Sequence, residues 1–220
     1  MKAIDLPESL ALLAALPEAA ALVRQPEVAA SWSLSSQLTG FTVGGVAGHL
    51  FRATQRLLPT LDGPAPAGEP AGFEAWYLAN RMAGPEDLDG DIARWIVDDG
   101  EHLAAKGPAV VASRLETLTS EVRERLAVED AERNVAVLRA DRPVPLRAYL
   151  GSRLLEAVIH ADDLAVSAGL ARSPIEDHIV GVACDLLTTM ARARSGNLAV
   201  LRALTRADRV ADPYEVLRVL

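Results

Sequence analysis

Apolar residues recur at intervals of three and four along most of the chain, whereas the alternation typical of strands is almost absent. This pattern predicts an all-α protein, an up-and-down helical bundle with extra C-terminal helices. At most one short strand is expected, at residues 133–139. The helices are expected over residues 7–36 (one or two helices), 42–58, 73–83, 88–105, 108–127, 145–169, 174–194 and 197–205.

Proline and glycine mark the interruptions of this pattern. Residues 59–72 are rich in both and predict a loop. Gly44, Gly45 and Gly48 lie inside the helix expected at 42–58, where each costs about 0.8–1 kcal/mol relative to alanine. We therefore expect another part of the chain to approach this helix closely.

The chain shows no internal repeat and no linker between domains. We expect residues 1–170 to form the bundle. Residues 171–220 are expected to form a C-terminal helical extension packed on the same core.

One expected helix carries a polar stripe with apolar residues on both sides. On a helix over residues 146–168 the stripe consists of Tyr149, Arg153, Glu156, His160, Asp163 and Ser167. A surface helix would instead show one apolar face opposite one polar face. The pattern therefore predicts a mostly buried helix whose polar stripe faces an internal cavity.

The spacing within this stripe suits a metal site. Glu156 and His160 are four residues apart, so both side chains can reach one ion. Among the other histidines, His49 is the best candidate for a third ligand, because it lies beside an apolar helical stripe and should point inward. A His₂Glu set suits catalytic Zn²⁺ and equally the Fe²⁺ triad. Asp163, one turn beyond His160, can orient its imidazole as a hydrogen-bond acceptor.

The same residues also allow a reading without metal. Glu and His four positions apart on a helix are common, and most such pairs are weak contacts worth about 0.2–0.5 kcal/mol. The cluster would then be a buried polar network. Arg153 has two readings as well: it pairs with the Glu156 carboxylate, or it binds the carboxylate of an acidic substrate.

Charge and composition narrow the class of protein. Lys and Arg number 22 against 30 Asp and Glu, a net charge of −8, which argues against nucleic acid or an anionic membrane as partner. No apolar run approaches the roughly 20 residues of a membrane-spanning helix, and we expect a cytoplasmic protein. Cys184, the single cysteine, is expected to be buried in an apolar helix. His102 and His178 are expected at the surface.

Two segments resemble a known family. Residues 38–50 (LTGFTVGGVAGHL) resemble the GWTV…HL signature of the mycothiol-dependent maleylpyruvate isomerase N-terminal family, which belongs to the DinB-like metal-binding four-helix bundles. Residues 149–164 (YLGSRLLEAVIHADDL) are similar to the family's second motif, R-x-x-E-x-x-x-H-x-x-D-L. The resemblance covers about residues 10–170. It departs from the family at Phe41 (commonly Trp), at Gly44 and Gly45 (commonly polar), and at Asp162 (commonly aromatic).

The resemblance implies a metal site and a thiol cosubstrate. It implies that His49, Glu156 and His160 bind a divalent metal, usually zinc, and that mycothiol, the small thiol of actinobacteria, is the cosubstrate. A metal-activated thiolate would add to an electrophilic or acidic small molecule, giving cis–trans isomerisation or S-conjugation. A metal hydroxide acting as a hydrolase is a third outcome. The alternative from another class is a non-catalytic DinB-like bundle that binds a metal or a ligand. A homodimer is compatible with either hypothesis.

Overall fold

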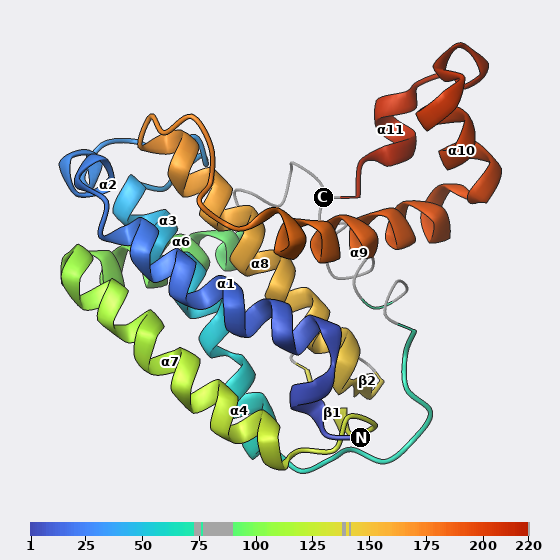
Figure 1. Ribbon diagram of the computed structural model, residues 1–220, viewed down its shortest axis with the longest axis horizontal. Coiled ribbons are helices and arrows are strands. Elements are labelled where there is room, and N and C mark those ends of the chain that lie inside the picture. The colour runs from blue at the N-terminus through green and yellow to red at the C-terminus, as the bar shows by residue number, and fades with distance from the viewer. Residues whose placement is uncertain (73–75, 77–89, 138–139, 141, 220) are drawn as a thin grey trace.

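The structure is a computed structural model that describes residues 1–72, 76, 90–137, 140 and 142–219 (Figure 1). Its elements are helices apart from one two-stranded ladder, so the all-α prediction is confirmed. In chain order they are η1 (Ala3–Asp5), α1 (Pro7–Val23), α2 (Pro26–Ser31), α3 (Val43–Gln55), α4 (Leu57–Asp62), α6 (Asp91–Ala104), α7 (Pro108–Val128), β1 (Asn134–Val135), β2 (Val144–Pro145), α8 (Leu146–Ser167), α9 (Asp177–Ser195), α10 (Asn197–Thr205), η3 (Ala207–Arg209) and α11 (Pro213–Leu217).

The bundle consists of α1, α3, α7 and α8, with α6 packed on α3 as an additional helix. Helix α1 packs against α7 and α8, and α3 packs against α8 and α6 (Figure 1). The faces between them are filled mainly by leucine, valine and alanine side chains that are fully buried. Helix α8 therefore lies in the interior, as its apolar flanks predict. Its polar stripe is directed toward α3.

The glycines of α3 allow an unusually close helix crossing. A Cβ atom on Gly48 would lie 2.2 Å from the carbonyl oxygen of Gly100 in α6, and one on Gly45 would overlap the Glu101 carboxylate. Glu101 uses this space to cap α3, because its Oε1 accepts a hydrogen bond of 2.7 Å from the Thr42 amide. The close approach expected from the glycine pattern is confirmed, and α6 is the partner.

Some predicted boundaries are wrong. The helix expected over 42–58 ends at Gln55, and α4 follows it directly, so Pro59 lies in a helix rather than in the predicted loop. Proline is tolerated there because it occupies the first turn, where its missing N–H has no intrahelical partner. The expected strand is shorter, with β1 at Asn134–Val135, and it pairs with β2, a strand that the pattern did not indicate. The helix expected at 73–83 falls largely outside the described residues.

The C-terminal helices extend beyond the bundle. The first half of α9 packs on α1 and α8 through Ile179 and Ala183, whereas α10 and α11 pack mainly on α9 and on each other (Figure 1). Cys184 in α9 is exposed, so the prediction that it is buried is wrong. Ala183, the residue before it, faces the core, whereas Cys184 itself points toward solvent. The division at residue 170 stays a prediction.

Within the described part of the chain, no helix is both long enough and apolar enough to span a bilayer.

Candidate metal centre

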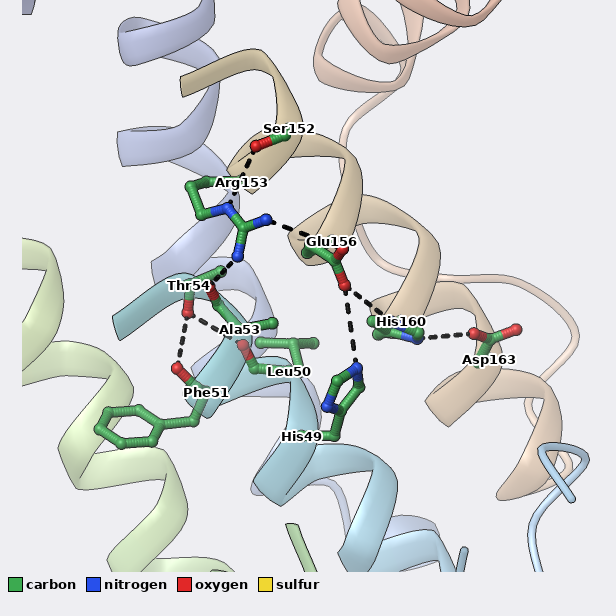
Figure 2. Close-up of polar contacts among 10 residues, drawn as sticks. All are labelled: His49, Leu50, Phe51, Ala53, Thr54, Ser152, Arg153, Glu156, His160 and Asp163. Carbon is green, nitrogen blue, oxygen red and sulfur yellow. Dashed lines mark hydrogen bonds and ion pairs between the residues drawn. The ribbon is translucent and has the colours of Figure 1, made fainter. Parts of the chain in front are cut away.

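His49, Glu156 and His160 converge at the interface between α3 and α8 (Figure 2). Oε2 of Glu156 lies 3.1 Å from Nε2 of His160 and 3.8 Å from Nε2 of His49. One potential ligand atom from each residue lies within 4.8 Å of the other two. The three residues that the sequence singles out are therefore brought together, although His49 lies more than a hundred positions before the other two.

The donor set and its spacing fit a zinc-sized ion. Tetrahedral ligands about 2.1 Å from zinc lie about 3.4 Å from one another. The two measured nitrogen–oxygen separations, 3.1 and 3.8 Å, fall on either side of that value. All three side chains are shielded, with exposed fractions of 14% for His49, 8% for Glu156 and 12% for His160. The cluster thus combines two nitrogen donors and one carboxylate in a site of restricted water access.

Asp163 fixes the ring of His160. Its Oδ2 lies 2.9 Å from Nδ1 of that ring, so Nδ1 donates to the carboxylate and Nε2 is turned toward Glu156. Burial alone would lower the pKa of His160, but the hydrogen bonds and negative charges of Asp163 and Glu156 outweigh it and raise the pKa to about 9. Without a metal the imidazole is therefore held as a cation, and a metal must displace its Nε2 proton.

Arg153 supports Glu156 from the other side (Figure 2). Its Nη2 lies 3.9 Å from Oε1 of Glu156, while its Nη1 donates to the carbonyl oxygen of Ala53 at 2.5 Å. Its Nε donates to the hydroxyl of Ser152. These contacts occupy the guanidinium within the protein and correspond to the pairing reading of Arg153. Binding of a substrate by Arg153 stays a prediction.

The other two histidines, His102 and His178, do not belong to the cluster. His102 is exposed, and His178 is exposed with its Nδ1 3.1 Å from the Glu176 carboxylate. Both surface predictions are confirmed.

Sequence reasoning missed a second group of polar side chains beside the site. Arg52 and Arg56 follow His49 at intervals of three and four on α3, a spacing that could have revealed them. Nε of Arg52 lies 3.2 Å from Oδ1 of Asp99 in α6. The guanidinium of Arg56 lies 4.9 Å above the ring of Trp95, also in α6.

Comparison with protein families gives one match. The family model described as the mycothiol maleylpyruvate isomerase N-terminal domain matches residues 12–165, which is most of the chain. The chain belongs to this family. No curated protein and no solved structure shows a significant match. Both motifs that carry the resemblance lie within the matched residues, and the bundle is the DinB-like fold expected of this mycothiol-related family.

Two departures from the usual pattern of the mycothiol maleylpyruvate isomerase N-terminal family have a structural reason here. The ring of Phe41 lies 5.5 Å from that of His49, so it forms part of the wall of the site. Gly45 leaves room for Glu101, and Gly44 leaves room for the ring of Trp32. The third departure, Asp162, is exposed and lies outside the cluster.

Proposed function

We propose that this protein is a metal-dependent thiol enzyme that uses mycothiol, with His49, Glu156 and His160 as ligands of a divalent metal, most simply Zn²⁺. The observation that carries the proposal is the convergence of these three shielded side chains from α3 and α8 in a chain of this family. We place the protein in the cytoplasm, with a small thiol and an electrophilic small molecule as partners.

When bound, a zinc ion would lower the pKa of a thiol so that the thiolate forms at neutral pH. A thiolate adds to the electrophilic carbon of an activated double bond, and the proton it has lost is available to the adjacent carbon. Rotation about the resulting single bond and expulsion of the thiolate give cis–trans isomerisation. Addition without expulsion gives an S-conjugate, the product of a transferase. Both outcomes need the same first step.

The protein's own residues prepare the site for this chemistry. Asp163 holds the imidazole of His160 in the orientation that presents Nε2. Arg153 holds Oε1 of Glu156, which leaves Oε2 directed at both histidines. Positions fixed in advance by such supporting contacts reduce the reorganisation that binding requires.

One observation favours a second candidate function. Glu156 and His160 already satisfy each other through a hydrogen bond of 3.1 Å, and Asp163 continues the chain of contacts. A non-catalytic bundle that uses this buried polar network for stability, or for ligand binding, would need no metal. The two proposals therefore differ in what the purified protein binds.

The metal content of the purified protein distinguishes the metal-dependent enzyme from the non-catalytic bundle. We expect about one zinc per chain by elemental analysis, and its loss in His49→Ala and Glu156→Gln. His102→Ala is the matched control, because this histidine is exposed and is not one of the three residues of the cluster. A protein that takes up no zinc on reconstitution, or whose zinc is unaffected by both cluster variants, would contradict the metal proposal and favour the polar network.

Thiol affinity then tests the enzymatic part. Calorimetric titration of the zinc-loaded protein with mycothiol should show binding with proton release, since a thiol binds as the thiolate. Zinc binding without any affinity for the thiol would favour the non-catalytic bundle.

A further inference from the structure

The C-terminal helices α10 and α11 have almost no core of their own. They project from the bundle at the far end of α9 (Figure 1). Over α10, η3 and α11, all of whose residues the structure describes, Val200 is the only residue that is buried. Helices of nine and five residues are too short to be stable in water without packing. We therefore expect another surface to cover them.

Helix α10 exposes a row of leucine side chains, which we call the leucine row. Leu198, Leu201 and Leu204 have exposed fractions between 56% and 64%. They are three residues apart, so they lie along one side of the helix and span about a third of its circumference. Arg202 and Arg206 are exposed beside them. Single exposed leucines are common, whereas a contiguous apolar patch rimmed by polar residues marks an interaction site.

The same part of the chain also contains an apolar groove, between α9 and α11, with a volume of about 430 Å³. Since α10 packs on both α9 and α11, the leucine row and the apolar groove belong to one structural unit. Both surfaces are open within one chain, so neither fills the other. The groove is lined by Leu187, Pro213, Tyr214, Leu217, Arg218 and Val219.

The two surfaces carry opposite net charge. Residues 197–206, which contain the leucine row, have two arginines and no acidic residue, a net charge of +2. Residues 207–219, which supply most of the groove, have two arginines and three acidic residues, a net charge of −1. The leucine row of one copy and the apolar groove of another therefore complement each other in charge as well as in apolar character.

We propose that this protein forms a two-fold symmetric dimer in which the leucine row of each copy occupies the apolar groove of the other. A two-fold interface uses the same patch on both copies, so a ridge and a groove on one unit are each filled in a single arrangement. The partner is a second copy because every chain presents both complementary surfaces. The metal ligands His49, Glu156 and His160 are not part of this interface, and the inference is independent of the metal.

Analytical ultracentrifugation tests the dimer directly. We expect a species of about 47 kDa, twice the 23.4 kDa of the chain, that dissociates on dilution. Leu201→Glu places a charge at the centre of the leucine row and should raise the dissociation constant at least about 30-fold, as loss of a central interface residue does. Added salt should weaken the dimer, because it screens the opposite charges.

Leu10→Glu is the matched control. Leu10 lies on α1 in the bundle and is 57% exposed, the same fraction as Leu201. Its replacement introduces the same charge and should leave the dissociation constant within about threefold of the unmodified protein, as expected of a surface substitution outside the interface. Thermal melting of both variants checks that they are folded.

Cross-linking tests which surfaces meet. A Cys184→Ser background removes the exposed native thiol. In this background one sample carries Leu201→Cys and a second carries Tyr214→Cys. When the two are mixed and oxidised, they should form a disulfide-linked heterodimer faster than either forms a homodimer, because the leucine row of one copy then faces the groove of the other. Both positions are exposed, so the substitutions leave the core intact.

A monomer at every accessible concentration would overturn the inference. So would a dimer that Leu201→Glu weakens no more than Leu10→Glu does, or cross-linking that is as fast within one sample as in the mixture. Binding of a monomer to phosphatidylglycerol vesicles, lost in Leu201→Glu, would assign the leucine row to a membrane surface instead. Zinc content should be equal in Leu201→Glu and the unmodified protein, so failure of the dimer and failure of the metal site are separate results.

Discussion

The contact between α3 and α6 makes Gly48→Ala strongly destabilising, although alanine is the better helix former. The added Cβ would lie 2.2 Å from the carbonyl oxygen of Gly100, and the obstacle is backbone that cannot rotate away. Overpacking of this kind costs roughly 1–3 kcal/mol, and the upper end applies to a rigid obstacle. The higher helix propensity of alanine offsets about 1 kcal/mol of this cost. The expected net loss in unfolding free energy is therefore about 2 kcal/mol.

Gly181→Ala is the matched control. Gly181 lies inside α9, and nothing lies within 4 Å of the position of an added Cβ. There the same substitution should raise the unfolding free energy by about 0.5–1 kcal/mol, since only the propensity gain remains. Urea denaturation measures both changes. In thermal melting the Gly48 variant should lose about 4–8 °C.

The Gly48→Ala substitution should also weaken metal binding at the cluster. Gly48 precedes His49, so a displacement of α3 from α6 changes the position of that imidazole relative to Glu156. Zinc affinity should therefore fall in Gly48→Ala and stay unchanged in Gly181→Ala. If both substitutions stabilise the protein to the same extent, the close approach of α3 and α6 is not present in solution.

Three other predictions follow from the site and from α9. Asp163→Asn should weaken zinc binding about 10–100-fold in a chelator competition, whereas Asp162→Asn, an exposed neighbour, should not. The pKa of His160 is raised to about 9 in the folded protein, so its protonation should add roughly 3 kcal/mol to the unfolding free energy of the metal-free form. This contribution is fully present below pH 6.5 and is lost as the pH rises to 9. Urea midpoints that stay constant over this range would contradict the prediction. Cys184 is exposed and should react with a thiol reagent in the folded protein, with no change in zinc content; a reaction that needs denaturant would show the thiol to be buried.

Periodicity was sufficient to predict most of the helices. The helix expected at 197–205 coincides with α10, and the one expected at 108–127 differs from α7 by one residue. These segments have an uninterrupted helical pattern and clear boundaries. The boundary between α3 and α4 at Arg56 was not predictable. Arg56 itself keeps helical backbone angles, and the helices on its two sides differ from one continuous helix only by a small change in hydrogen bonding.

Side-chain environments were predictable only where one helix determines them. Glu156, His160 and Asp163 lie on consecutive turns of α8, so their proximity follows from spacing alone. The apolar neighbours of Cys184 suggested burial, but α9 covers the bundle only through part of its surface, and its exposure depends on where the helix runs in space. The polar surroundings of Arg56 come from α6, α4 and α8 together, and no local pattern could reveal them.

The Glu101 cap and the glycine contacts join α3 and α6 into one mechanical unit. Opening α6 would break the hydrogen bonds to the Thr42 amide and hydroxyl and would remove the backbone packing beside Gly48. The two helices should therefore exchange their amide hydrogens as a single cooperative segment rather than independently. A displacement of α6 at Trp95 should consequently also displace α3. The imidazole of His49, which belongs to α3, would then change its position when α6 moves.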